Sequence, residues 1–429
     1  MTYQKSLDAL KNIEIAQYQP DHRNSLHLMA YLDSPQNALP VIHIAGTNGK
    51  GSTAKYIQSI LTSAGYKVGT FLSPHILDFR ELIEDYEGAI SELDFSKATD
   101  LVLDACSRMV DDHLNHPTLF ECLVAIALVH FRDKKHDFII IEVGMGGTYD
   151  ATNVFDKPLM TVITPISFDH EQHLGHSLQA IAAHKAGIIK ADSPVIMAPN
   201  PIEVVMEVTK KVKEVDTYLY LLDESLIQVY LLFNSFKKKL LNIRTPFFAY
   251  HGLSTSMIGR HQEINLATAL LAIHELKKNW SIPDLAVKSG VANTTWTCRN
   301  EWVSYNPMIL VDGGHNPQGL QAVKDILDTY CKDKTIITVI GMLKDKDYKA
   351  MLNLAESFSH KVILTSPLSS RAITFDDLGL LKNTKLEWID PFEQAIKKGL
   401  SLLDDHSVLL ITGSLYLAYP AKMWLKDNL

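Results

Sequence analysis

The chain contains 429 residues, of which 46% are hydrophobic and 21% are charged, and its formal net charge is −8. This length favours two domains, and the composition is that of a soluble globular protein. The acidic balance excludes a broadly basic nucleic-acid-binding protein, and no apolar run reaches the ~18 residues of a membrane span. The N-terminal residues lack a signal pattern and the four scattered cysteines lack CxxC spacing, so we expect a cytoplasmic protein with reduced thiols.

Short apolar, β-branched runs alternate with helical patterns in the first half of the chain. Buried parallel strands are predicted at residues 41–45, 67–72, 137–143, 159–164 and 194–198. Helices are predicted between them at residues 52–64, 95–114 and 119–132. This alternation is typical of a doubly wound α/β domain. The runs TYLYLLD and IQVYLLF then indicate a small β-rich extension near residues 215–250.

A second α/β cycle follows a helical segment at residues 259–278. Its strands are predicted at residues 308–313, 335–341, 361–366 and 407–413. We therefore expect a doubly wound domain at residues 1–292, including the extension, and a smaller, Rossmann-like α/β domain at residues 293–429. The active site is expected in the cleft between the two domains.

The strongest local motif is IHIAGTNGKGST at residues 42–53, where a predicted strand turns into a helix. Glycines let backbone N–H groups approach phosphate oxygens, and the helix N-terminus favours negative charge. Lys50 adds a cation. The standard Walker pattern does not fit, because Ile44 stands where its first glycine belongs. We favour a mononucleotide site and a P-loop-type ATPase domain over a glycine-rich turn without a ligand.

Eleven sequence blocks in order resemble the Mur ligase family, in particular its folate–glutamate ligases. Five of them are GTNGKGST (46–53), SPHILDFRE (73–81), EVGMGGTYDATNV (142–154), HKAGIIK (184–190) and VDGGHNP (311–317). The resemblance implies that a substrate carboxylate attacks the γ-phosphate of ATP and that the amine of L-glutamate captures the resulting acyl phosphate. Such a reaction needs cations and N–H donors for the transferring phosphoryl group more than it needs a protein nucleophile.

The resemblance also implies the residues that bind ATP and Mg²⁺. Two magnesium ions are expected, with Ser73, Glu142 and His170 as ligands, each shortly after or at the end of a predicted strand. For His170 the plain alternative is a hydrogen-bonded structural histidine. The expected ATP contacts are Gly46, Thr47, Asn48, Gly49, Lys50, Gly51, Ser52, Asn265, Arg299 and Asp312.

Three residues are expected beside the reacting groups, namely Lys50, Lys185 and His315. Lys185 matches a position that members of the family carry as a carbamylated lysine. A carbamate forms on a neutral amine and turns a cation into an anion that can orient a metal-bound group. The alternative is an unmodified lysine on a helix surface.

By resemblance, the pterin of a folate would face Thr118, Phe120, Asp150, Ala151 and Thr152. An aromatic ring and short polar groups suit a flat heterocycle. Phe120 could equally be a core residue, and the helix dipole alone explains Glu121. The family often has an arginine where Thr148 stands, so this chain lacks one anchor for a pterin or its carboxylate tail.

We therefore expect an ATP-dependent ligase with folate and L-glutamate as substrates, without nucleic-acid or membrane partners, and monomeric as its family is. Thr148 favours polyglutamylation over a bifunctional enzyme that also uses dihydropteroate. A cell-wall ligase is disfavoured, because the phosphate loop begins at residue 46 and leaves no room for an N-terminal nucleotide domain. A regulatory protein that has lost catalysis is the alternative from another class.

Overall fold

The computed structural model describes residues 1–13, 21–378 and 385–429, which form two compact units. The first unit comprises Met1–Gln228, Ile243–Tyr250 and Ile264–Asn293. The second comprises Val229–Asn242, His251–Glu263 and Thr294–Leu429. The segments 229–242 and 251–263 thus group with the C-terminal part of the chain. The domain limits expected from the sequence stay a prediction.

The first unit is built on a sheet of order β4-β3-β2-β5-β1-β6-β7-β8. Strands β1, β2, β5, β6, β7 and β8 are parallel, and the β3–β4 hairpin adds an antiparallel edge. The bounds are β1 Val41–Ala45, β2 Val68–Phe71, β3 Ile83–Asp85, β4 Gly88–Ala89, β5 Phe138–Glu142, β6 Met160–Ile163, β7 Val195–Met197 and β8 Leu219–Leu221. The five strands predicted in this half are confirmed, and they carry the continuous apolar runs of strands buried on both faces.

The run TYLYLLD belongs to this sheet and not to the small extension. Its strand β8 pairs in parallel with β7, with Val195 opposite Leu219. The crossover is helix α8, Ile202–Glu214, whose buried Val204, Val208 and Val212 lie on one side. A parallel neighbour requires such a crossover, and periodicity alone did not show that α8 supplies it.

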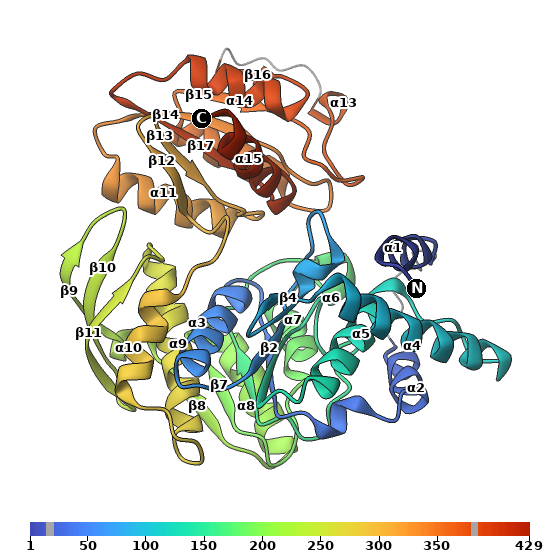
Figure 1. The fold of residues 1–429 in the computed structure, drawn as a ribbon. Helices are drawn as coiled ribbons and strands as arrows, with labels where there is room; N and C mark the ends of the chain where they lie inside the picture. The colour runs from blue at the N-terminus through green and yellow to red at the C-terminus, as the bar shows by residue number, and fades with distance from the viewer. Residues whose placement is uncertain (14–20, 379–384) are drawn as a thin grey trace. The chain divides into compact units, whose positions relative to one another are not determined.

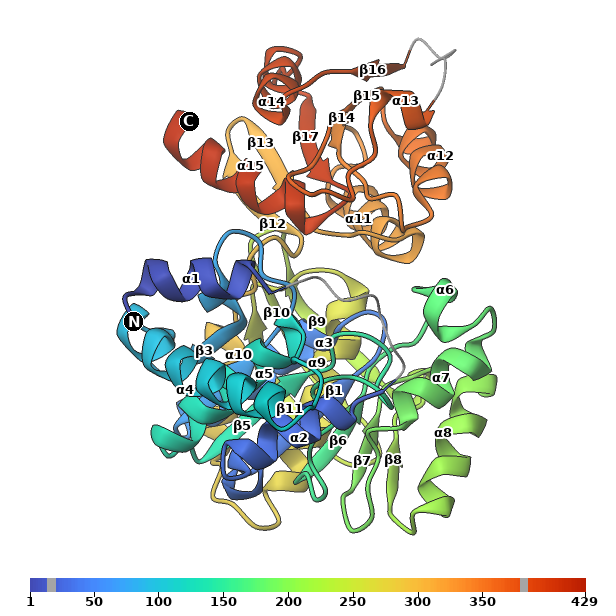
Figure 2. The ribbon, with the colours of Figure 1, turned by 90° about the vertical axis from the view of Figure 1, so that its right-hand side faces the viewer.

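Helices cover both faces of the first sheet (Figures 1 and 2). Their bounds are α1 Tyr3–Lys11, α2 Arg23–Tyr31, α3 Lys50–Ser63, α4 Glu92–Asp111, α5 Leu119–Asp133, α6 Glu171–Leu174, α7 Leu178–Ala186, α8 Ile202–Glu214, α9 Arg260–Leu276 and α10 Asp284–Asn293. Short 3-10 turns lie at Pro35–Ala38, Phe79–Leu82 and Glu224–Leu226. One core joins α4 and α5 to Val41, Ile139 and Ile141, and another joins α7 and α8 to Ile163 and Met197.

A three-stranded sheet of order β11-β10-β9 follows, with β9 Gln228–Asn234, β10 Lys239–Arg244 and β11 Ala249–Thr255. The second unit contains a sheet of order β12-β13-β17-β14-β15-β16, in which β12 is antiparallel. Its helices α14 and α15 share a core with one face, and α11 and α12 cover the other (Figure 2). The bounds are β12 Glu301–Tyr305, β13 Met308–Val311, α11 Pro317–Tyr330, β14 Thr335–Ile340, α12 Tyr348–Phe358, β15 Lys361–Leu364, α13 Phe375–Leu378, β16 Leu386–Trp388, α14 Phe392–Ser401, β17 Ser407–Thr412 and α15 Leu415–Asn428.

Within the described ranges, no helix combines the length and the apolar character that crossing a membrane requires.

Helices α3 and α10 approach each other at a glycine. A Cβ atom on Gly290 would lie 2.4 Å from the Cα of Ile60 and 2.8 Å from the carbonyl oxygen of Ser59. The Ser59 hydroxyl also donates a hydrogen bond of 2.7 Å to the Gly290 carbonyl. Because the obstacle is backbone, a side chain here can fit only if the helices separate.

We expect Gly290→Ala to lower the free energy of unfolding by about 1–3 kcal/mol, the usual cost of overpacking. Urea unfolding of the whole chain measures this difference. Lys288→Ala, at an exposed position of the same helix, is the control and should change stability by less than about 0.5 kcal/mol. Equal stability of the Gly290 variant and the wild type would contradict the close approach.

Candidate active site

The turn between β1 and α3 depends on two glycines. A Cβ atom on Gly46 would lie 1.9 Å from Oγ1 of Thr164, at the end of β6. Gly49 has φ +85°, and a Cβ atom there would lie 2.3 Å from Oδ1 of Asn265 in α9. The structure therefore brings Asn265 to the glycine turn, as an ATP-contacting residue would require. Helix α3 begins at Lys50, directly after Gly49, so its first N–H groups point toward the turn.

Thr47 and Asn48 fasten the turn to the segment after β6. Their backbone N–H groups donate to the Pro165 carbonyl at 2.9 and 3.1 Å. The Thr47 hydroxyl donates to the Ser167 carbonyl at 3.0 Å, and Asn48 Nδ2 lies 3.3 Å from Ser167 Oγ. The backbone N–H groups of Thr47 and Asn48 are therefore used within the protein, by the Pro165 carbonyl.

Lys50 lies beside Glu142 at the carboxyl end of β5. Its Nζ is 3.6 Å from Glu142 Oε1 and donates to the Thr47 carbonyl at 3.2 Å. The side chains of Lys50 and Glu142 are 17% and 7% exposed, so this charge pair is largely shielded from water. A cation and a carboxylate in such surroundings interact more strongly than they would at the surface.

Ser73 lies just after β2, and Glu142 is the last residue of the adjacent parallel strand β5. Phe71 of β2 is opposite Ile141 of β5, which places Ser73 and Glu142 at the same edge of the sheet. His170 lies after β6 in a left-handed conformation with φ 52°, and its side chain is 30% exposed, with Nε2 3.8 Å from Asp169 Oδ2. The residues that the structure describes include no cluster of three or more His, Cys, Asp or Glu suited to a metal. The expected set contains two such residues and a serine, so its role stays a prediction.

Lys185 is buried and directed at the glycine turn. It lies in the last turn of α7, is 5% exposed, and its Nζ donates to the Gly46 carbonyl at 2.8 Å. The alternative of a lysine on a helix surface is therefore wrong. The amines of Lys185 and Lys50 thus both donate to backbone carbonyls of the turn, those of Gly46 and Thr47.

The second unit brings Arg299, Asp312 and His315 together. Asp312 accepts hydrogen bonds from the N–H groups of Asn300, at 2.8 Å, and Gly314, at 2.6 Å. Burial raises the pKa of Asp312, while Arg299, these two backbone donors and His315 oppose the rise. The Asp312 carboxylate thus fixes the turn after β13 and also lies near the Arg299 guanidinium.

The residues expected at the pterin begin at the start of α5. Thr118 caps this helix, and its hydroxyl and backbone exchange hydrogen bonds with Glu121. Glu121 also accepts from the Ser25 hydroxyl at 2.9 Å, so it is a capping residue that anchors α2. Phe120 is half-buried against the core, with its ring 5.9 Å from that of Phe71. This half-buried position is consistent with both alternatives raised by the sequence, a contact with the pterin and a core residue.

Asp150, Ala151 and Thr152 are all buried, with exposed fractions of 6%, 8% and 0%. Asp150 Oδ2 accepts from the Met145 N–H at 2.8 Å, and Oδ1 accepts from the Thr152 N–H at 3.0 Å and its hydroxyl at 2.5 Å. The N–H and the hydroxyl of Thr148 both donate hydrogen bonds to the His184 carbonyl. The assignment of these residues as substrate contacts stays a prediction.

Sequence reasoning missed three residues that hold the site in place. Glu81 accepts from the N–H groups of Ile76 and Asp78 and so shapes the loop after Ser73. Asn153 donates to the carbonyls of Thr148 and Gly187. His43 lies 2.9 Å from Thr152. The one available signal was a lone histidine within the apolar run VIHIA.

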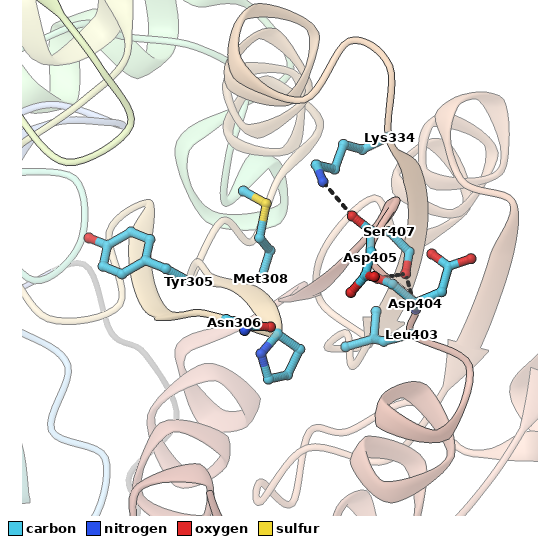
Figure 3. A pocket seen from close by; sticks show the side chains of 9 residues that line it. Tyr305, Asn306, Met308, Lys334, Leu403, Asp404, Asp405 and Ser407 are labelled. Carbon is cyan, nitrogen blue, oxygen red and sulfur yellow. Dashed lines mark hydrogen bonds between the residues drawn. The ribbon is translucent and has the colours of Figure 1, made fainter.

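A hollow of about 230 Å³ lies elsewhere in the second unit, at the amino ends of its parallel strands (Figure 3). It is lined by Tyr305 and Met308 of the β12–β13 hairpin and by Lys334 and Ser407, which precede β14 and begin β17. Lys334 Nζ donates to the Asp405 carbonyl at 2.8 Å. Ligands of open parallel sheets bind at the carboxyl ends, where Asp312 and His315 lie, so we give this hollow no part in the reaction.

Comparison with known families agrees with this geometry. The model of the Mur ligase middle domain matches residues 44–273, and that of the Mur ligase glutamate ligase domain matches residues 298–415. The first range contains the glycine turn, Glu142, Lys185 and Asn265, and the second contains Arg299, Asp312 and His315.

Individual relatives match along nearly the whole chain. A "dihydrofolate synthase/folylpolyglutamate synthase" of Bacillus subtilis is 34% identical, covering 91% of each chain. The structure of a Mycobacterium tuberculosis folylpolyglutamate synthase complexed with ADP is 26% identical, with a TM-score of 0.90 and 98% of each chain covered. A structure described as an FPGS–AMPPCP–folate complex is 29% identical, with a TM-score of 0.88 over 99% of this chain and 100% of that one. The chain therefore belongs to the Mur ligase family, among the folylpolyglutamate synthases and the bifunctional dihydrofolate synthase/folylpolyglutamate synthases.

Proposed function

We propose that this protein is an ATP- and Mg²⁺-dependent ligase that adds L-glutamate to a reduced folate through an acyl phosphate. The observation that carries the proposal is the convergence of Lys50, Lys185 and Asn265 on the glycine turn of a chain whose relatives are folate ligases. The turn supplies backbone N–H groups and a helix N-terminus for phosphate oxygens. These are the groups that phosphoryl transfer requires.

Residues of this chain would reduce the repulsion between two anionic reactants, the substrate carboxylate and the triphosphate of ATP. Lys50, now paired with Glu142 and with the Thr47 carbonyl, would neutralise charge on the β- and γ-phosphates. Asn265 would contact ATP from α9. Arg299 and Asp312 are proposed as further ATP contacts and His315 as a residue beside the reacting groups, which the resemblance implies and which mutation can test.

Magnesium would be held by Ser73, Glu142 and His170. The donor set fits, because the Glu142 carboxylate and Ser73 hydroxyl are oxygen ligands at one edge of the sheet, although an imidazole is a less usual ligand for Mg²⁺. When bound, the ions would supply positive charge that neutralises the triphosphate. We propose two of them by family resemblance.

Carbamylation of Lys185 is part of the proposal. The buried position of its amine favours the neutral form that a carbamate needs. A carbamate would also reverse the charge next to the Gly46 carbonyl. Carbon-13 NMR of protein equilibrated with labelled bicarbonate tests the modification, and a spectrum without a Lys185-dependent carbamate signal would exclude it.

A bifunctional enzyme that also accepts dihydropteroate is the second candidate, favoured by the name of the Bacillus subtilis relative. Thr148 argues against it. The family often has an arginine at this position, whereas the Thr148 hydroxyl donates a hydrogen bond to the His184 carbonyl. We propose folate as the main acceptor, and a protein that acts as a cytoplasmic monomer without nucleic-acid or membrane partners.

The first test is ADP release by purified protein with Mg²⁺, L-glutamate and either a reduced folate or dihydropteroate. We expect release with the folate, loss of release with a chelator and recovery with added Mg²⁺. Release with both acceptors would establish the bifunctional enzyme. Release with neither acceptor would overturn the proposed function.

We expect Lys50→Ala and His170→Ala each to reduce kcat by at least about 100-fold, because Lys50 would balance phosphoryl charge directly and His170 would hold a Mg²⁺ ion that does so. Steady-state ADP release measures the effect. Lys157→Ala and His176→Ala are the matched controls, since their side chains are 78% and 81% exposed, and should retain the wild-type rate. A folded Lys50 or His170 variant with a near-normal rate would remove that residue from the site.

Gly49→Ala should raise the KM for ATP by about 10-fold or more, because its Cβ would displace Asn265 from the turn. Gly65→Ala is the control, since Gly65 has φ +92° with nothing within 4 Å of its added Cβ. Both variants bear the left-handed backbone cost of about 1–2 kcal/mol. Equal KM values for ATP in the two variants would show that backbone strain, and not the lost contact with Asn265, changes the KM.

A further inference from the structure

A buried chain of hydrogen bonds runs from the central strand of the first sheet to the segment after Glu142. Asp150 Oδ1 is 2.5 Å from the Thr152 hydroxyl, which in turn is 2.9 Å from His43 Nε2 in β1. Thr152 and His43 are both 0% exposed, which argues against the sequence-based expectation that Thr152 itself contacts the pterin. Their effect on a substrate would then pass through Asp150.

The direction of these bonds follows from the number of protons. The Thr152 hydroxyl has one proton, and the Asp150 carboxylate accepts it. The same hydroxyl can then only accept from His43, so the His43 proton is on Nε2. Burial lowers the pKa of His43 to about 3, with a smaller contribution from Lys190, so the ring is neutral and carries this single N–H. Its Nδ1 has no hydrogen-bond partner among the described residues, as expected for the acceptor nitrogen.

Asp150 connects the Thr152 hydroxyl to the backbone of the segment after Glu142. Its other oxygen accepts from the N–H of Met145, and the N–H of Gly144 also donates to the carboxylate. A Cβ atom on Gly144 would lie 2.6 Å from the ring of Phe120, so the backbone that Asp150 holds is the surface against which Phe120 packs. Rotation of the Asp150 carboxylate would therefore disturb Phe120 and the segment 144–152 together.

We infer that His43 and Thr152 are positioning residues of the folate site, acting through Asp150 to hold residues 144–152 and the Phe120 ring in the arrangement that the pterin needs. The assignment of that surface to folate depends on the proposed function. The hydrogen-bonded chain itself does not, and it can be measured separately.

Matched variants separate positioning from general stability. Thr152→Val and His43→Leu remove the hydroxyl and the N–H, whereas Thr152→Ser and His43→Gln retain a hydroxyl and an amide donor of similar reach. We expect the first pair to raise the folate KM by about 10- to 100-fold, the effect of losing one buried hydrogen bond of the chain, with the ATP KM changed less than about 3-fold. The second pair should stay within about 3-fold of wild type for both substrates. The double variant His43→Leu/Thr152→Val should be no worse than either single one, because the residues act as a unit.

Hydrogen–deuterium exchange of the whole chain gives a readout that needs no substrate. Amide exchange in residues 144–153 should quicken by about 10-fold in Thr152→Val and His43→Leu but not in their conservative partners. Unchanged exchange in these variants, or equal rises in the folate and ATP KM values, would overturn the inference. So would failure of both apolar variants to fold when the conservative pair folds normally, since the chain would then be a folding element. If the wild type showed no folate-dependent turnover, the proposed function would be wrong. The exchange measurements would then be the test of whether the hydrogen-bonded chain holds residues 144–153.

Discussion

The absence of side chains at Gly46 and Gly49 allows the end of β6 and helix α9 to meet the turn between β1 and α3. Thr164 occupies the space that a Cβ on Gly46 would need, and Asn265 occupies the space beside Gly49. The Gly46 carbonyl is also the acceptor for Lys185. One short turn therefore sets the distances among residues spread along the chain from Gly46 to Asn265. Any phosphate chemistry at the turn would depend on the geometry of these contacts.

Carboxylates in the two units divide into two kinds by the donors that surround them. Asp150 and Asp312 are buried and accept mainly backbone N–H groups, so each fixes a turn of its own unit. Burial raises the pKa of both, and these hydrogen bonds restrain the rise. Glu142 instead faces the ammonium group of Lys50, a side-chain cation that a phosphate can also attract. The first kind fixes the backbone beside it, and the second pairs with a side-chain cation.

Hydrogen bonds to backbone also explain how irregular segments keep a defined shape beside the sheet. The segment from Gly144 to Asn153 contains no helix or strand, yet Asp150, Thr148 and Asn153 bond it to itself, to α7 and to the residue after α7. A buried irregular segment must satisfy its polar groups in this way. The same requirement accounts for Glu81, whose carboxylate serves the N–H groups of the loop after Ser73.

The sequence by itself determined the main strands, the glycine turn and the family. Apolar, β-branched runs such as VIHIA and DFIIIEV are typical of strands buried on both faces, and blocks such as GTNGKGST need particular residue types at fixed spacing. Local patterns could not show that β8 joins the large sheet, because pairing depends on where α8 returns the chain. Nor could they show that Glu121 accepts a hydrogen bond from Ser25 of α2, that Lys185 is buried against Gly46, or that His43 supports Thr152. Those facts depend on contacts between distant segments, which tertiary packing alone decides.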